Sequence, residues 1–403
     1  MPALPPEIIA SNVADIVAPT PSMPRFHRSD PRTRRLIYQG AFFLVLLAAG
    51  FYFGSNAAAN IARRGLELGF AFLGRTANFA IGETIISYSP ADSYGRALLV
   101  GAANTLMVAI VGCVLTTVLG VALGILRLST NPLLARLVGT YVELGRNIPL
   151  LLQLFFWYSL VTRLGGARDA WSPLPGVFVS NRGLRAPTIV ANDAFAYALG
   201  ALVLAIVLCV IVKRWAELRQ AATGKRPPVL AVMLAVLGGL PILGGLASGG
   251  SLALDYPQLQ GFNFTGGMAL SPEFVALLTG LTLYTTAFVT EIVRTGIQAV
   301  PHGQWEASRA LGLSSGRIMR LVILPQAMRV IIPPLTSQYL NLTKNSSLAV
   351  AIGYPDLISI SGTVINQTGQ ALEVIFIFMA IYLAISLATS AGMNLLNNRL
   401  GLR

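Results

Sequence analysis

The polar stretch QWEASRALGLSSGRIMRLVILP, residues 304–325, lies between two apolar segments that are each long enough to cross a membrane. Its first part predicts a short helix that ends at Gly312, because glycine readily adopts the left-handed conformation that closes a helix. Ser314 or Ser315 can cap a second helix, which we expect Pro325 to end. Small and apolar side chains share one stripe of the first helix: Ala307, Ala310 and Leu311. A polar helical hairpin with such a stripe indicates a surface on which a partner docks; the alternative is an inert loop.

The composition places this hairpin in a polytopic membrane protein. Hydrophobic residues make up 54% of the 403 residues and charged residues only 11%. The mean hydropathy of +0.67 exceeds what the core of a soluble protein needs. A helix needs about 17 to 25 apolar residues to cross a bilayer, so we expect an all-α bundle of about eight transmembrane helices. The expected spans are residues 36–54, 97–126, 133–162, 193–213, 229–248, 272–297, 328–352 and 371–396.

The net charge of +13 does not indicate nucleic-acid binding, because the basic residues follow the predicted topology. With eight spans and a cytoplasmic amino terminus, the basic residues of the amino-terminal tail, of the loop after the fourth span and of the hairpin all lie on the inner face. The outer segments 249–271 and 353–370 contain no lysine or arginine. The outer segments 55–96 and 163–192 do contain arginines and depart from this rule. We expect both termini in the cytoplasm.

The segments between and beside the spans differ in character. Residues 1–35 predict a disordered basic cytoplasmic tail, 55–96 a periplasmic amphipathic segment and 397–403 a short cytoplasmic tail. Residues 163–271 predict an insertion of two extra helices, bounded by loops rich in proline and glycine. In the second span, Gly120 and Gly124 lie four residues apart and allow a neighbouring helix to approach closely.

Polar residues inside two spans indicate a lined pathway. In the third span, Glu143 and Arg146 lie three apart and can pair, and Asn147 and Pro149 follow. Proline removes an intrahelical hydrogen bond and frees carbonyls, which a membrane tolerates only where protein or water satisfies them. The seventh span contains a second polar group: Asn341, Lys344, Asn345, Ser346 and Ser347. The alternative is that these residues only stabilise the bundle near the inner interface.

The hairpin resembles the EAA signature of ABC-importer permeases. Glu306-Ala307-Ser308, then Gly312, then Val322-Ile323-Leu324-Pro325 follow that signature, with serine and valine in place of its second alanine and its isoleucine. The segments RNIPLLLQ at 146–153 and KNSSL at 344–348 resemble motifs of the polar amino acid, or histidine-permease-like, branch. These motifs occur in the right order over about residues 95–396, and the extra spans resemble the longer permeases of general or acidic L-amino acid uptake systems.

The resemblance implies a division of labour between subunits. Within residues 97–396 it implies a type I ABC-importer core of five helices, formed by the second, third, sixth, seventh and eighth spans, with the coupling loop at 301–325. A dimer of separate ATPase subunits would dock on the coupling residues, which are Glu306, Ala307, Ser308, Ala310, Leu311 and Gly312. The resemblance further implies a second permease subunit in a heterodimer, a periplasmic substrate-binding protein and a location in the bacterial inner membrane.

The chain is expected to contain no catalytic site. It lacks a Gly-x-x-x-x-Gly-Lys-Ser/Thr loop, which cradles the phosphates of ATP in nucleotide-hydrolysing subunits. Only two histidines are present, so a metal site is not expected. We therefore expect a non-catalytic transport subunit without a cofactor, with ATP and magnesium used by the partner ATPase.

An amino acid substrate needs donors for its carboxylate and an acceptor for its ammonium group. Glu143, or a carbonyl freed near Pro149, is the predicted acceptor. The predicted donors are Asn147, Gln153, Lys344, Asn345, Ser346 and Ser347. A permease restricted to glutamate, glutamine and aspartate is an alternative that the sequence does not separate from a broad L-amino acid range. An ion-coupled secondary transporter is the alternative from another class; it favours inverted repeats and a relay of membrane acids, and this sequence shows no repeat and few such acids.

Overall fold

The computed structural model describes residues 31–63, 69–190, 192–224, 227–248 and 253–399. The chain divides into two units, Met1–Gly69 and Phe70–Arg403. The first unit contains helix α2, Pro31–Arg63, whose segment Arg34–Asn56 is long and apolar enough to cross a membrane. The expected tail at 1–35 lies outside the described residues except for its last five positions, which begin α2. The last residues of the expected carboxyl-terminal tail, 400–403, also lie outside the described part.

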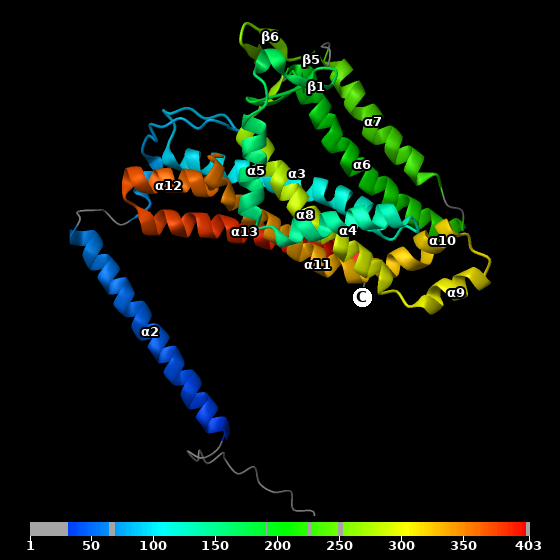
Figure 1. The fold of residues 1–403 in the computed structure, drawn as a ribbon, viewed down its shortest axis with the longest axis horizontal. Helices are drawn as coiled ribbons and strands as arrows, with labels where there is room; N and C mark the ends of the chain where they lie inside the picture. Colours follow the sequence, from blue (N-terminus) through cyan, green and yellow to red (C-terminus); the bar gives the residue numbers. More distant parts are fainter. Residues whose placement is uncertain (1–30, 64–68, 191, 225–226, 249–252, 400–403) are drawn as a thin grey trace, which may run out of the picture. The chain divides into compact units, whose positions relative to one another are not determined.

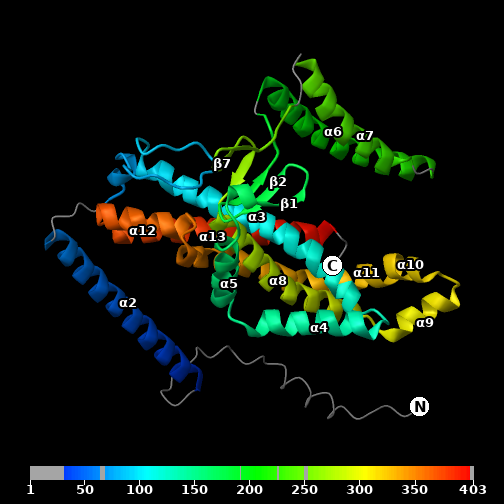
Figure 2. The same cartoon turned by 45° about the horizontal axis from the view of Figure 1, so that its top comes forward.

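The second unit is built on long helices that pack side by side (Figure 1). Its main helices are α3 Tyr94–Arg127, α4 Pro132–Asn147, α5 Leu150–Thr162, α8 Pro272–Gln298, α11 Leu324–Asn345, α12 Leu357–Thr368 and α13 Ala371–Arg399. Helix α8 packs against α3, α5 and α11, and α11 packs against α13. Figures 1 and 2 show α12 at one end of this bundle and the short helices α9 His302–Ala310 and α10 Ser315–Ile318 at the other.

Two helices pack closely where α3 crosses α8. Gly120 and Gly124 are buried, and a Cβ at Gly120 would lie 2.5 Å from a Cγ of Val289. A Cβ at Gly124 would lie 2.7 Å from Cβ of Val293. Only glycine permits this approach, so the sequence prediction of close packing at these two residues is confirmed.

The helices begin where side chains cap them. Ser93 accepts a hydrogen bond from the backbone N–H of Arg96 at the start of α3, and Ser271 caps α8 just before Pro272. Proline suits the first turn because its missing N–H has no partner there. These local signals place the first residues of both helices near the boundaries that the apolar runs predict.

Seven helices in the described ranges are long and apolar enough to span a membrane, whereas the sequence predicted about eight. The difference lies at residues 133–162, which form two helices, α4 and α5, instead of one continuous span. Ile148, the residue before Pro149, is extended with φ −90° and ψ 128°, because proline disfavours the helical conformation of its predecessor. The proline therefore divides the helix into two segments.

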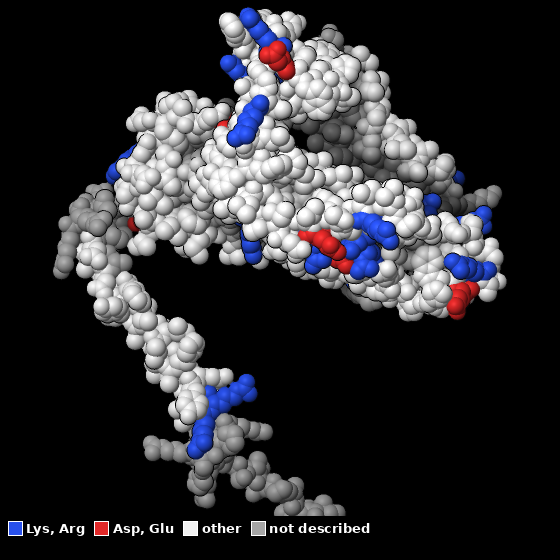
Figure 3. Space-filling view, in the orientation of Figure 1, with Lys and Arg blue, Asp and Glu red and all other residues white. Residues whose placement is uncertain are grey.

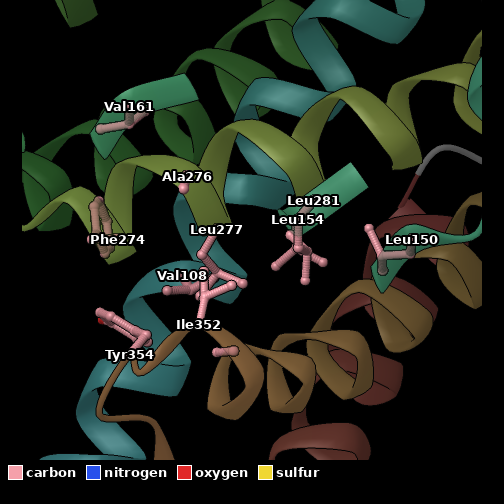
Figure 4. Packing of buried hydrophobic residues seen from close by; sticks show 11 residues of the cluster. Val108, Leu150, Leu154, Val161, Phe274, Ala276, Leu277, Leu281, Ile352 and Tyr354 are labelled. Atoms are coloured by element: carbon pink, nitrogen blue, oxygen red, sulfur yellow. The ribbon is translucent and has the colours of Figure 1, made fainter. Parts of the chain in front are cut away.

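The buried core lies where α5, α8 and the turn after α11 meet. Figure 4 shows Leu154 of α5 beside Leu281 of α8, and Leu277 of α8 beside Val108 of α3 and Ile352; Leu150 belongs to the same cluster. Ile352 ends the 3₁₀ turn η4, Ser346–Ile352, which follows α11 directly. The segments with the polar residues of the third and seventh spans, 146–153 and 344–348, therefore both contribute to one apolar cluster, through Leu150 and Leu348.

The insertion contains a helical hairpin and small sheets. Helices α6 Asp193–Thr223 and α7 Val229–Ala247 pack together. The flanking segments 163–192 and 249–271 were predicted as loops, and that prediction was wrong, because they contain the 3₁₀ turn η2 Ala167–Asp169 and eight short strands. The strands are β1 Trp171–Leu174, β2 Val177–Ser180, β3 Gly183–Ala186, β4 Thr188–Ile189, β5 Leu254–Asp255, β6 Gln258–Gln260, β7 Asn263–Thr265 and β8 Met268–Leu270.

A four-stranded sheet with the order β1-β2-β3-β8 joins the two flanking segments. Gly183 turns β2 into β3 with φ +95°, and a Cβ there would lie 2.0 Å from the carbonyl oxygen of Leu270. Glycine therefore permits both the turn and the close approach of β8. Sequence patterning did not predict this sheet because its strands are short and because β3 pairs with the distant β8, for example through Leu184 and Leu270.

The segment before α3 packs onto the bundle. It contains the 3₁₀ turn η1, Ala71–Gly74, and Phe72 and Ala77 are buried in a cluster with Leu98 of α3 and Leu357 of α12. Residues 70–93 thus form part of the folded second unit.

Candidate functional site

The polar hairpin has an exposed tip on a buried base. Trp305 and Leu313 pack against a cluster that includes Ile318 and Ile323. Of the six predicted coupling residues, Ser308 alone is buried, and its hydroxyl donates to the carbonyl of Gln304 at 2.6 Å. The other five are exposed: Glu306, Ala307, Ala310, Leu311 and Gly312. The hairpin therefore presents a rigid, partly apolar surface.

The turn of the hairpin has the left-handed conformation at Gly312 that the sequence predicts. Gly312 has φ +71°, and its N–H donates to the carbonyl of Arg309 at 2.9 Å. The N–H of Leu313 donates to the carbonyl of Ser308 at 3.2 Å. Leu311, beside the turn, is 80% exposed. With the exposed Ala307 and Ala310, Leu311 makes the tip of the hairpin partly apolar.

The second helix of the hairpin does not end at Pro325, contrary to the sequence prediction. Helix α10 continues through a π-helical turn, η3 Met319–Ile323, directly into α11. In this turn the N–H of Leu324 donates to the carbonyl of Met319. The wider turn accommodates the proline ring without breaking the helix.

Three side chains form an ion network that links α3 to α8. Glu291 pairs with Arg294 on its own helix at 2.5 Å and with Arg127 at the end of α3. Glu291 and Arg294 lie three apart on one helix, but Arg127 lies 164 residues from Glu291, and no sequence signal identified it. Figure 3 shows charged side chains gathered over the region of α4 and α8 and over the hairpin, on a mostly uncharged face.

Gln153 satisfies the backbone at the helix break. Its Nε2 donates to the carbonyl of Gly145 at 3.0 Å and to that of Ile148 at 3.0 Å. The first of these carbonyls lies four residues before Pro149 and has lost its helical donor there. A carbonyl freed near Pro149 and the Gln153 amide were both predicted to contact substrate. The Gly145 carbonyl and the Gln153 amide are instead hydrogen-bonded to each other. Beside them lies a hollow of ≈ 380 Å³, bordered by Tyr141, Phe156 and Trp157.

The charged residues before the break are not paired with each other. Glu143, Arg146 and Asn147 are exposed, and within the described ranges neither Glu143 nor Arg146 forms an ion pair. The predicted pair is therefore absent. The Arg146 guanidinium instead lies 5.3 Å from the centre of the Phe288 ring of α8.

The polar group of the seventh span lies at the change from α11 to η4. The Ser346 hydroxyl donates to the carbonyl of Thr343 at 2.7 Å, and that of Ser347 to the carbonyl of Lys344 at 2.7 Å. Lys344 is exposed and Asn345 is half-buried. The hydroxyl groups of both serines are therefore hydrogen-bonded to backbone carbonyls. The ammonium group of Lys344 has no acidic partner among the residues that the structure describes.

A polar junction at the α12 end of the bundle was not predicted. Asn104 of α3 donates through Nδ2 to the carbonyls of Glu83 and Pro355, both at 2.9 Å. Asp356 is 1% exposed, its Oδ1 accepts the N–H of Ser359, and burial raises its pKa to about 6. Burial also raises the pKa of Glu83. A lone asparagine within the apolar second span was the one sequence signal for this junction.

Comparisons with known proteins agree on one family. A family model described as a binding-protein-dependent transport system inner membrane component matches residues 227–402. The general L-amino acid transport system permease protein AapQ of Rhizobium johnstonii is 45% identical, over 93% of this chain and 94% of that protein. The putative amino-acid ABC transporter permease protein YhdX of Escherichia coli is 47% identical, over 93% and 96%. The glutamate/glutamine/aspartate/asparagine transport system permease protein BztB of Rhodobacter capsulatus is 42% identical, over 93% and 95%.

Proposed function

This chain belongs to the family of binding-protein-dependent transport system inner membrane components and is an amino acid permease of the ABC transporter class, and from that premise we propose that it moves L-amino acids inward across the bacterial inner membrane. Its seven candidate spans make it a multi-pass membrane protein. The three relatives each match 93% of this chain, so the proposal rests on a likeness over nearly its whole length.

The observation that carries the proposal is the geometry of the hairpin. Ala307 and Ala310 of α9 and Leu311, which follows it, are exposed, while Trp305 and Leu313 pack against a cluster that includes residues of α8 and α11. A separate ATPase subunit docks on this surface and moves the hairpin when ATP is bound and hydrolysed. Because the base of the hairpin continues into two membrane helices, a displacement at the tip is transmitted to the bundle as a rigid-body movement.

The remaining partners follow from this arrangement. Two ATPase subunits require two hairpins, and a related second permease chain supplies the other hairpin in a heterodimer. A periplasmic binding protein delivers the amino acid to the outer face, which carries the sheets of the insertion. The hairpin and both termini lie in the cytoplasm. ATP and magnesium are used by the partner, and this chain contributes no cofactor.

The substrate contacts come from polar groups that the backbone does not already use. Glu143, Asn147, Lys344 and Asn345 remain available to an amino acid, since no side-chain hydrogen bond or ion pair engages them in the described structure. Gln153, Ser346 and Ser347 donate to backbone carbonyls and shape the site indirectly.

The test uses the chain with its partner permease, ATPase and binding protein in proteoliposomes. We expect ATP-dependent amino acid uptake, and we expect Leu311→Asp to abolish uptake and to release the ATPase during purification. Gln220→Glu, an exposed change in the last turns of α6, is the matched control and should leave both unaltered. Normal uptake and normal ATPase retention with Leu311→Asp would refute the docking surface.

A further inference from the structure

We propose that one face of the four-stranded sheet β1-β2-β3-β8 is the surface on which the binding protein docks when it delivers its substrate. The proposal rests on the proposed function, which brings a periplasmic binding protein to the outer side of the membrane. It names the docking surface and gives the insertion at 163–271 a function of its own. The matching surface of the partner carries apolar side chains surrounded by acidic ones.

The strand register shows which side chains share each face of the sheet. Directly paired residues of an antiparallel sheet lie on the same face, and neighbours along a strand alternate between faces. Trp171 pairs with Val179, which pairs with Leu184. Leu184 in turn pairs with Leu270 of β8. We call the face that contains this row the apolar sheet face, and its side chains are those of Trp171, Leu174, Val177, Val179, Leu184, Ala186, Met268 and Leu270.

The two faces of the sheet differ in what covers them. On the other face the Phe178 ring stacks on the ring of Phe264, a buried residue of β7, with 4.6 Å between the ring centres. The hairpin of β6 and β7 therefore covers that face. On the apolar sheet face every side chain is exposed or half-buried, and Trp171 and Leu174 are 67% and 64% exposed. A contiguous exposed apolar patch of this kind marks a site of interaction.

The sheet lies beyond the end of a candidate membrane span. Strand β8 ends two residues before Pro272, the first residue of α8, whereas the polar hairpin follows the last turn of α8 (Figure 1). Helix α8 has 27 residues, or about 40 Å, which exceeds the hydrocarbon thickness of about 30 Å. Strand β1 stands at the edge of the sheet, and open sheet edges do not occur in lipid hydrocarbon. The apolar sheet face is therefore open to water or to a protein, on the side opposite the hairpin.

Arginines flank the apolar sheet face. Arg168 shortly precedes β1, and Arg182 lies in the turn between β2 and β3. Both are exposed, and neither forms an ion pair in the part of the chain that the structure describes. Segments 163–192 and 249–271 contain four arginines and two aspartates, and one of these, Asp255, already accepts a backbone N–H. Figure 3 shows basic side chains over the sheets together with fewer acidic ones. The rim is therefore complementary to acidic residues of a partner.

This composition favours a soluble protein as the occupant. Protein interfaces are enriched in aromatic residues and arginine, and tryptophan and arginine are common among the residues that dominate binding. Pro173 lies within β1 and lacks the N–H that an added strand would need, so the partner contacts side chains. The family to which the chain belongs works with a binding protein. A docking surface also explains the arginines of 163–192, which the positive-inside rule does not predict on the outer side.

The test measures the affinity of the binding protein for the complete complex in nanodiscs, without transport. The complex contains this chain, its partner permease and the ATPase, and the labelled binding protein of the same system is titrated onto it. Trp171→Asp and Leu174→Asp each place a charge in the apolar sheet face. Phe262→Ser is the matched control, because Phe262 is a 73% exposed aromatic residue of the same insertion outside that face. Retention of the ATPase during purification shows that each variant is folded.

We expect Trp171→Asp to weaken binding about 30-fold, the size of a lost interface hot spot, and Leu174→Asp at least about fivefold. Phe262→Ser should stay within about twofold of the wild type. Arg182→Gln should weaken binding about threefold at low salt and less at high salt, because salt screens the attraction of rim charges. Arg185→Gln removes the same charge from the covered face and should change binding less.

Equal affinities of the wild type, Trp171→Asp and Leu174→Asp would overturn the docking surface. Loss of the partner permease from the Trp171→Asp complex would also overturn it and would assign the face to a contact between subunits. Weakened binding that appears only in nanodiscs of anionic lipid would assign the face to lipid headgroups instead. Failure of the wild-type complex to transport any amino acid in proteoliposomes would refute the proposed function, whereas the affinity is measured without transport.

Discussion

Replacing Gln153 by leucine tests the hydrogen bonds that hold the break between α4 and α5. The side chain donates to the carbonyls of Gly145 and Ile148, each at 3.0 Å. A net contribution of about 0.5 to 1.5 kcal/mol per bond gives about 1 to 3 kcal/mol for the pair. Gly145 and Gln153 are only half-buried, so water can replace part of the lost bonding and we expect about 2 kcal/mol.

A double-mutant cycle separates this role from a general packing effect. Pro149→Ala restores a backbone N–H that can donate to the carbonyl of Gly145, and it lets Ile148 adopt the helical conformation. In this background Gln153→Leu should cost about 1 to 2 kcal/mol less than in the wild type. Stability is measured as the free energy of unfolding in mixed detergent micelles, with Gln220→Leu as an exposed glutamine control.

Additive effects of Pro149→Ala and Gln153→Leu, within about 0.5 kcal/mol, would contradict this role of Gln153, since independent sites are additive. Such a result would mean that Gln153 does not satisfy the break and that its amide is free for the substrate. Uptake measurements on the same variants then decide whether the loss appears in the apparent affinity for amino acids.

Three further results are expected. Gly120→Ala places a Cβ 2.5 Å from a Cγ of Val289 and should destabilise the α3–α8 contact by about 1 to 3 kcal/mol, whereas Gly392→Ala enters open space and should be neutral or stabilising; equal effects in unfolding assays would contradict the close crossing. Gly312→Val forces a β-branched residue to φ +71°, which costs about 1 to 2 kcal/mol, and should uncouple ATP hydrolysis from uptake more than Gly312→Asn does; identical coupling ratios for the two variants would refute the left-handed turn. Burial raises the pKa of Asp356 from 3.8 to about 6, so the folded state holds this proton more tightly than the unfolded chain. The stability that this group contributes is full below pH 3.8 and is lost as the pH rises through 6. Asp356→Asn should remove that part of the pH dependence, and parallel profiles of stability against pH for the two proteins would argue against it.

Local signals predicted a large part of the molecule. The apolar runs predicted the spans, Gly120 and Gly124 predicted a close helix contact, and Gly312 predicted the turn of the hairpin. Pro149 indicated freed carbonyls inside the third span. Each of these signals lies within one continuous stretch of the sequence and requires no knowledge of distant neighbours.

Other features depended on neighbours that are distant in sequence. Patterning did not reveal that Arg127 joins Glu291, that β3 pairs with β8, or that Asn104 bonds Glu83 and Pro355. The continuation of the hairpin through Pro325 also depended on the packing of Ile318 and Ile323 around a π-helical turn.

The sequence by itself determined the membrane class of the protein, the polar hairpin and the two interrupted helices that bear its candidate site. The tertiary structure decided which polar groups of that site remain available: Gln153, Ser346 and Ser347 are used by the backbone, while Glu143, Arg146 and Lys344 have no ionic partner in the described chain. The physical reason is that a helix and its breaks follow from hydrogen bonds between near neighbours. Whether a side chain is satisfied depends instead on groups that packing brings together from separate helices.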